Sequence, residues 1–243
     1  MMTRVPASPA PSLGTLVDLV RARHAAQTHV GAYVIALDGA VSVGKSTTAA
    51  LLAGMLAGPP GPLAAHVVST DGFIFPNHEL AARGLMMRKG FPESYDHDAL
   101  EAFVASVRNG AAELHAPAYS HEVYDILPQP ESFPVPDVLV IEGLHTMRLA
   151  SIVDLSIYVD AAEDDIVRWY TERFVELSQA SSGFYAQFSS LSPDAVGEIA
   201  HEVWREINAP NLHEHILPNR DLADVVLCKG PDHEVTAVTL RDA

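Results

Sequence analysis

The segment GAVSVGKS, from Gly39 to Ser46, has the residue spacing that most clearly indicates chemistry. It matches the pattern G-x-x-x-x-G-K-[ST], follows an apolar run typical of a buried strand and opens a run typical of a helix, which is the context that this motif requires. Its glycines let backbone N–H groups converge on phosphate oxygens, and the helix N-terminus adds free donors. Lys45 is expected to place a positive charge at the β- and γ-phosphates, and Ser46 to ligate Mg²⁺. The segment therefore predicts a nucleoside triphosphate site, whose expected phosphate-binding residues are Gly39, Ala40, Val41, Ser42, Val43, Gly44, Lys45, Ser46 and Thr47.

Two acidic residues end two other apolar runs, Asp71 in VVSTDG and Glu142 in VLVIEG. Ligands collect at the carboxyl ends of the strands of a parallel sheet, so both acids are expected near the phosphate site. One of them would position a metal ion or water, and the other would accept a proton from an attacking hydroxyl. The alternative is that each caps a turn, which Asp71 before Gly72 also fits.

Basic residues form two clusters in a chain that is otherwise acidic, Arg88 with Lys89 and Arg168 with Arg173. On a helix, Arg173 could pair with Glu172 or Glu176, or it could reach over the phosphates and stabilise the transferring group. The residues alone favour neither interpretation.

The segment YSHEVYDIL, residues 119 to 127, gathers Tyr119, Ser120, His121, Tyr124 and Asp125 in a short stretch. It is too polar for a buried strand and too aromatic for a solvated loop. Taken alone, it fits either a substrate-binding wall or a structural loop.

The elements that must position these residues follow from the hydrophobic periodicity. Apolar strands alternating with helices predict one three-layer α/β domain with a mostly parallel central sheet and helices on both faces. Thr15 is predicted to cap the first helix, and Ser192 with Pro193 to begin the last. The proline-rich stretch 128–136 is predicted to be a loop, residues 1–14 a mobile N-terminal tail and residues 15–243 a single domain. The predicted strands are 32–37, 66–73, 136–143, 155–161, 223–230 and 234–241, and the predicted helices are 15–26, 45–56, 94–110, 163–177 and 192–208.

The composition limits the partners and the compartment. The formal net charge of −16 argues against nucleic acid, because phosphate neutralisation needs a basic face. No apolar run is long enough to span a membrane. Cys228 is the only cysteine, which is consistent with a reducing cytoplasmic location.

Several segments, in order and with similar spacing, make the chain resemble the prokaryotic type I pantothenate kinases from about Tyr33 to the C-terminus. The most specific are RKGFPESYD and YSH-x-x-YD, and they are accompanied by STDGFIFPN, WYTERF, INAPNL and ILPNRDLADVVLCKGPDHEV. The resemblance implies the P-loop kinase fold and ATP- and Mg²⁺-dependent phosphorylation of pantothenate to 4′-phosphopantothenate, the first step of coenzyme A biosynthesis.

The resemblance also implies a role for individual residues. Asp71 is expected to be the base, Lys45 and Arg173 the phosphate-stabilising cations, and Ser46 with Glu142 the Mg²⁺ environment. Lys229 and His233 fall in the segment that approaches the adenine. The residues expected to bind pantothenate are Tyr119, His121, Tyr124, Tyr170, Phe174, Phe188 and Asn208, with Phe184 and Tyr185 also in the apolar lid.

Some positions depart from the family pattern. Only 38 residues precede Gly39, so the chain is expected to be an N-terminally short variant. Ala50 stands where an Arg usually helps to hold nucleotide phosphates and the inhibitor coenzyme A, which predicts weaker inhibition by coenzyme A. His145 stands where Asn is more usual.

These departures leave two alternatives. One is a related P-loop kinase that acts on a nucleoside or a sugar, and the other is a non-catalytic paralogue that binds nucleotide or coenzyme A. The family also implies a homodimer.

Overall fold

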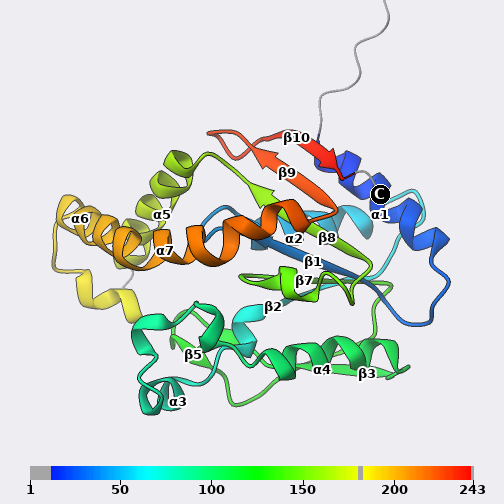
Figure 1. Cartoon of the computed structure of the whole chain (residues 1–243), viewed down its shortest axis with the longest axis horizontal. Coiled ribbons are helices and arrows are strands. Elements are labelled where there is room, and N and C mark those ends of the chain that lie inside the picture. Colours follow the sequence, from blue (N-terminus) through cyan, green and yellow to red (C-terminus); the bar gives the residue numbers. More distant parts are fainter. Residues whose placement is uncertain (1–11, 180–182, 242–243) are drawn as a thin grey trace, which may run out of the picture.

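The computed structural model describes residues 12–179 and 183–241, and its centre is a twisted sheet of six strands (Figure 1). The strands pair in parallel except for the last, which runs antiparallel to its neighbour at one edge. The inner strands are almost entirely buried, as their apolar sequences predict. In spatial order the strands are β10 (Val235–Leu240), β9 (Val225–Lys229), β8 (Leu155–Asp160), β1 (Tyr33–Gly39), β7 (Val138–Glu142) and β2 (Ala65–Ser69).

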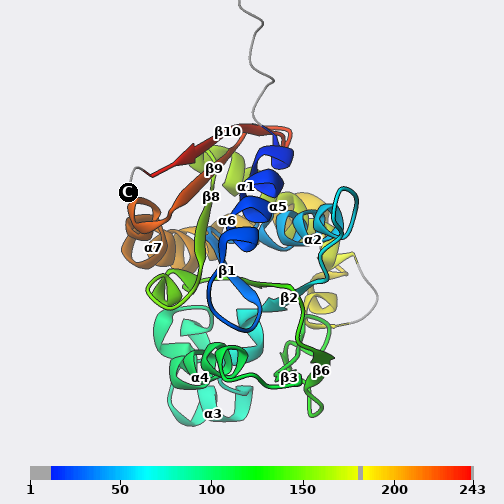
Figure 2. The same cartoon turned by 90° about the vertical axis from the view of Figure 1, so that its right-hand side faces the viewer.

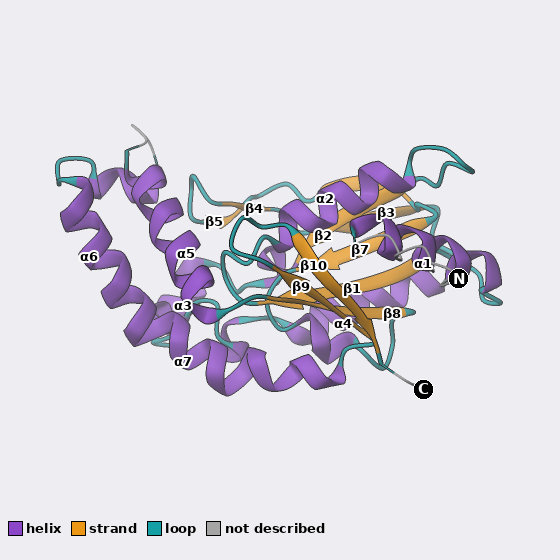
Figure 3. Cartoon of the chain, turned by 90° about the horizontal axis from the view of Figure 1, so that it is seen from above, coloured by secondary structure: helices purple, strands orange, loops and turns teal. Residues whose placement is uncertain are grey.

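Helices cover both faces of this sheet, which confirms the predicted three-layer α/β fold (Figure 3). α1 and α2 lie on one face, and α4 lies with the helical run that contains α7 on the other, while α5 and α6 stand beyond one end of the strands. The α-helices are α1 (Leu13–Ala26), α2 (Lys45–Leu56), α3 (Asn77–Ala82), α4 (His97–Arg108), α5 (Glu163–Ser178), α6 (Pro193–Val203) and α7 (Ala209–Asn211).

Of the two predicted helix N-caps, one is confirmed and the other is wrong. Ser192 caps α6 by accepting a hydrogen bond from the Ala195 N–H, with Pro193 in the first turn, as predicted. The prediction that Thr15 caps the first helix is wrong. α1 begins at Leu13 after Ser12, so Thr15 lies inside the helix and its N–H donates to the Ser12 carbonyl. Residues 13 and 14, which the prediction placed in the tail, belong to α1, and residues 1–11 lie outside the described part of the chain.

Two predicted elements change character along their length. The strand predicted over 66–73 ends at Ser69, because residues 70–73 form a 3₁₀ turn in which the Ser69 hydroxyl accepts from the Asp71 N–H. The helix predicted over 192–208 becomes π-helical at Trp204–Asn208. Both changes occur beside the cavity described below.

Two small hairpins were not predicted. β3 (Glu113–Ala116) pairs with β6 (Glu131–Pro134) beside α4, so the proline-rich stretch is not a loop throughout (Figure 2). β4 (Tyr119–Ser120) pairs with β5 (Asp125–Ile126) and forms a second hairpin from the YSHEVYDIL segment. Pro134 is tolerated at the end of a two-stranded ribbon, where its missing N–H breaks no inner ladder.

The apolar core has one main part and two satellites. The main cluster joins the sheet to α1, α2, α4 and the 204–216 region. One satellite, Phe174, Val196 and Ala200, joins α5 to α6 and packs against the segment Phe184–Phe188. This segment and α5 are thus held by their own small core. No helix of the described residues is both long and apolar enough to cross a membrane.

Candidate active site

The phosphate-binding loop joins β1 to α2 and has the backbone that its glycines predict. Gly44 lies immediately before α2 with φ +86°, a left-handed conformation. Lys45 is only 8% exposed and donates to the carbonyl oxygens of Gly39 and Ala40 at 3.0 and 2.8 Å. Burial lowers the pKa of Lys45, while the carboxylates of Glu142 and Asp38 oppose this shift. The loop thus presents a desolvated cation at the N-terminus of α2.

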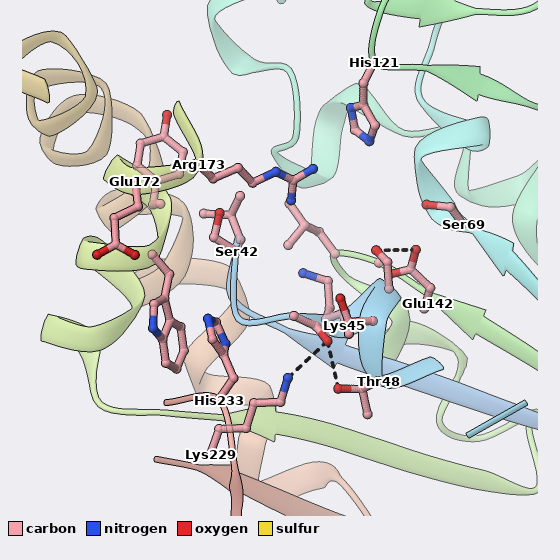
Figure 4. Close-up of a pocket in the computed structure, with 18 of the residues that line it drawn as sticks. Ser42, Lys45, Thr48, Ser69, His121, Glu142, Glu172, Arg173, Lys229 and His233 are labelled. Atoms are coloured by element: carbon pink, nitrogen blue, oxygen red, sulfur yellow. Dashed lines mark hydrogen bonds between the residues drawn. The ribbon is translucent and has the colours of Figure 1, made fainter. Parts of the chain in front are cut away.

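Glu142 ends β7 and lines the cavity (Figure 4), as does Ser46 from the first turn of α2. The Ser46 hydroxyl donates to Glu142 Oε1 at 3.1 Å, and the Ser69 hydroxyl also reaches the Glu142 carboxylate. Burial raises the pKa of Glu142, whereas the nearby Lys45 lowers it. Hard oxygen donors beside a phosphate site are the set that Mg²⁺ prefers, so these residues fit that ion.

Asp71 lies at the end of β2 and lines the same cavity as Lys45 and Glu142. Its Oδ2 is 3.8 Å from His121 Nε2. The two residues come from separate segments, so the fold places a carboxylate and an imidazole side by side at the cavity wall.

Arg173 projects from α5 into the cavity above Lys45, with His121 across from it (Figure 4). In the part of the chain that the structure describes, no carboxylate forms an ion pair with Arg173. Arg168, earlier on the same helix, instead forms ion pairs with Asp165 and Glu172, with nitrogen–oxygen distances of 2.8 and 3.7 Å. This arrangement favours the phosphate interpretation of Arg173 over the interpretation that pairs it with Glu172.

Lys229 and His233 lie on the other side of the loop from the acids. Lys229 is 9% exposed, and its ammonium donates to the carbonyls of Val43 and Gly44 at 3.0 and 3.2 Å. Burial lowers the pKa of Lys229 to about 8, with a further contribution from Lys45. His233 stacks on Trp169 with ring centroids 3.9 Å apart. His233 and Trp169 thus form a stacked pair of rings suited to binding a nucleotide base. Lys229 instead contacts the phosphate loop itself.

Four tyrosines gather at the opposite end: Tyr170 and Tyr185 line the cavity, and Tyr119 and Tyr124 lie close to Asp71. Burial raises the pKa of all four, to about 12 for Tyr124, so their hydroxyls are neutral hydrogen-bonding groups. Tyr124 stacks on Phe184 with centroids 4.3 Å apart and has φ +58°. The result is an aromatic chamber with polar tips.

The predicted acceptor residues lie in two shells. His121, Tyr170 and Phe174 line the cavity of about 1020 Å³. The other four support it. Tyr119 packs edge-on against His121 and Tyr124, the Asn208 side chain lies close to the Tyr170 hydroxyl, and Phe188 packs on Phe174.

Several cavity residues were not predicted as ligands. Ser69 and Trp169 line the cavity, as does Tyr185, which was expected only in the apolar lid, and Lys89 lies behind Tyr119 and Tyr124. For Ser69 the position two residues before Asp71 at a strand end was an available signal. Lys89 lies in the RKGFPESYD segment, but no spacing rule links it to Tyr124.

A phosphate-binding loop at a strand–helix junction, an arginine above it and a strand-end aspartate beside an aromatic chamber together define a P-loop kinase of the small-molecule class. Residues 34–173 match the sequence profile of the Phosphoribulokinase / Uridine kinase family. The chain is 45% identical to the pantothenate kinase of Myxococcus xanthus, with 86% of this chain and 72% of that protein covered. It is 40% identical to the pantothenate kinase of Vibrio vulnificus, with 88% and 75% covered. The chain therefore belongs to the phosphoribulokinase/uridine kinase family and, within it, to the pantothenate kinase family.

Solved structures agree on the fold. The chain superposes on a putative fructose transport system kinase from Silicibacter sp. TM1040 with a TM-score of 0.70 and 25% identity, covering 89% of this chain and 98% of that one. It also superposes on D-glycerate 3-kinase from Cryptococcus neoformans with a TM-score of 0.68 and 12% identity, covering 94% and 99%. The predicted P-loop kinase fold is confirmed.

Proposed function

We propose that the protein transfers the γ-phosphoryl group of ATP to the primary hydroxyl of pantothenate, which yields 4′-phosphopantothenate and begins coenzyme A biosynthesis. The observation that carries the proposal is the aromatic chamber beside Asp71, in a chain 45% identical to a pantothenate kinase. Pantothenate has hydroxyl, amide and carboxylate groups around a gem-dimethyl carbon. Neutral tyrosine hydroxyls and Asn208 suit the polar groups, and Phe174 suits the methyl groups.

Asp71 is the proton acceptor of the proposed reaction. The acceptor oxygen bonds to the γ-phosphorus as its proton passes to the Asp71 carboxylate, and the bond from phosphorus to the β,γ-bridging oxygen breaks, leaving ADP. His121, 3.8 Å from Asp71, is placed to orient the carboxylate or the hydroxyl.

Lys45 and Arg173 lie below and above the part of the cavity in which we place the transferring group (Figure 4). Charge spreads over the phosphoryl oxygens in the transition state, and preorganised cations in a water-poor cavity stabilise it. Because Lys45 is already buried and hydrogen-bonded, little reorganisation accompanies the reaction.

Ser46 and Glu142 would hold Mg²⁺, directly or through water. When bound, the ion would neutralise charge on the β- and γ-phosphates. Ser42 to Thr47 supply the loop and helix N-terminus that orient the phosphates, and His233 with Trp169 forms the base end.

The test is a coupled assay of ADP release with pantothenate, several nucleosides, fructose and D-glycerate as acceptors. We expect pantothenate alone to give turnover well above the ATPase background, and mass spectrometry to detect its monophosphate. Turnover of a nucleoside or sugar with pantothenate at background would overturn the proposal. Nucleotide binding without turnover of any acceptor would support a non-catalytic paralogue instead.

A further inference from the structure

The ammonium group of Lys89 closes a small ring of hydrogen bonds behind the acceptor chamber. Lys89 Nζ donates to Asn77 Oδ1 and to the Tyr124 carbonyl, both at 2.7 Å. The Asn77 side-chain amide donates to the same Tyr124 carbonyl at 2.9 Å. Two side chains from two other segments of the chain therefore fix the position of one peptide.

That peptide is in a conformation that needs support. Tyr124 has φ +58°, a left-handed conformation that costs a residue other than glycine about 1–2 kcal/mol. The hairpin that contains it pairs only Tyr119 with Ile126 and Ser120 with Asp125, and so short a ribbon is marginal alone. The Asn77 N–H adds a bond to Asp125 Oδ1 at 3.0 Å, which ties the hairpin to the start of α3.

Lys89 also contacts the faces of both chamber tyrosines. Its ammonium lies 4.0 Å from the ring centroid of Tyr124 and 4.9 Å from that of Tyr119. A cation over an aromatic face is attracted to the ring, and the attraction grows when water is excluded. One side chain therefore fixes both the backbone of the hairpin and the rings that it presents.

We infer that Lys89 is a positioning residue for the acceptor, which holds the 119–126 hairpin in the shape that places His121 beside Asp71, with Tyr119 and Tyr124 packed in support of the cavity wall. Lys89 acts through the hairpin and has no part in the phosphate loop. The inference deepens the proposed function and rests on it for the identity of the acceptor.

The kinetic test uses Lys89→Met, which keeps the length of the side chain and removes its charge. We expect KM for pantothenate to rise by about tenfold or more, the scale of a lost charge-assisted contact, while KM for ATP changes by less than about twofold. Arg88→Met is the matched control, because Arg88 also lies over a ring, that of Phe91, and pairs with Glu93, away from the hairpin. Equal effects on the two KM values, or the same effect in Arg88→Met, would contradict the inference.

A pH profile distinguishes the role of the Lys89 charge from that of the size of its side chain. Burial lowers the pKa of Lys89 to about 8, and Asp125 and Asp71 oppose the shift. The groups facing the ammonium are these two carboxylates and the rings of Tyr119 and Tyr124. Since Lys89 loses its proton as the pH rises through about 8, kcat/KM for pantothenate should fall over that range. In Lys89→Arg, which stays charged, this fall should disappear. An unchanged alkaline limb in Lys89→Arg would count against the inference.

Hydrogen–deuterium exchange tests the positioning role without any substrate. The Leu127 N–H donates to the Ala118 carbonyl, and amides of 119–127 should exchange faster in Lys89→Met than in wild type. Amides of α2 should be unchanged, which shows that the variant is folded. Faster exchange with no turnover of pantothenate by the wild type would uphold the hairpin role and reject the acceptor, whereas unchanged exchange would reject the hairpin role.

Asn77→Ala provides a second, independent variant. Both side chains act on the Tyr124 carbonyl. The double variant Asn77→Ala/Lys89→Met should therefore lower kcat/KM by a smaller factor than the product of the factors measured for the two single variants. Fully multiplicative effects would show that the two residues act independently, contrary to the inference.

Discussion

Gly44 and Lys229 meet across the phosphate loop: a Cβ atom on Gly44 would lie 2.6 Å from the Lys229 ammonium nitrogen. The two residues are far apart in sequence, yet the ammonium donates to the Gly44 carbonyl at 3.2 Å. Gly44 thus has two structural roles. Its φ of +86° is a conformation that favours glycine, and the absence of a side chain leaves room for the Lys229 ammonium. The shape of the loop therefore depends on β9 as well as on the motif.

We predict that Gly44→Ala weakens both ATP binding and the fold. The left-handed backbone should cost about 1–2 kcal/mol of unfolding free energy, and displacement of Lys229 should raise KM for ATP about tenfold or more. Gly54→Ala is the control. It lies in the exposed interior of α2, where an added Cβ atom would meet no other atom within 4 Å, so it should stabilise by about 0.5–1 kcal/mol. Chemical denaturation and initial-rate kinetics measure both quantities, and equal loss of stability in the two variants would disprove the strain argument.

Lys229 should give ATP use an alkaline limit. Its pKa is lowered to about 8 from an ordinary value of 10.5, so the charged form persists below about pH 8 and is lost above it. Loss of the proton weakens the hold on the Val43 and Gly44 carbonyls, so kcat/KM for ATP should fall as the pH rises through about 8. In Lys229→Met the profile should be low and flat over this range. A wild-type limb that persists in Lys229→Met would have to come from another group.

Asp71→Asn should abolish turnover while leaving nucleotide binding intact. Asn keeps the shape of the side chain but cannot accept a proton, and general-base catalysis contributes about 10²–10⁴-fold in rate. We expect kcat to fall by that factor, with the Kd of an ATP analogue by calorimetry changed less than about threefold. Glu79→Gln, a surface acid of α3 paired with Arg83, is the control. A kcat near that of wild type would exclude Asp71 as the base.

Ala50→Arg should strengthen inhibition by coenzyme A. Ala50 is exposed on α2, so an arginine there needs no repacking. The family resemblance implies that an arginine at this position holds phosphates of nucleotide and coenzyme A. One charge-assisted contact predicts roughly a tenfold or greater decrease in the inhibition constant. The measurement is inhibition by coenzyme A at fixed ATP, and unchanged inhibition would show that position 50 does not face the inhibitor.

The parts of the site that follow from local sequence were predictable. The phosphate loop and α2 have the predicted bounds because glycine conformation, a strand before and a helix after are all encoded within one short segment. The strand-end acids were predictable for a similar reason, since parallel strands end on one edge. The roles of Tyr119, Tyr170 and Asn208 came only from the family resemblance, because they converge from three distant segments.

What the sequence did not indicate depends on contacts between distant residues. β4 and β5 have two residues each, too few for a periodic pattern, and their pairing depends on Asn77 and Lys89. The π-helical turn that ends at Asn208 has ordinary helical periodicity and differs only in its hydrogen bonds. Lys229 was expected at the adenine, but its bonds to the phosphate loop cross 186 residues and leave no local signal.

The stacking of His233 on Trp169 gives the molecule an optical property. The chain has two tryptophans, and their surroundings differ. Both are largely buried, but Trp169 lines the cavity at the base end, whereas the Trp204 ring centroid lies 5.6 Å from that of Tyr170, beside the acceptor chamber. Indole emission responds to stacking and to local polarity, so Trp169→Phe and Trp204→Phe would each leave one fluorophore. Stopped-flow fluorescence on the two variants would then time the arrival of nucleotide and acceptor separately, in an enzyme that carries its own pair of reporters.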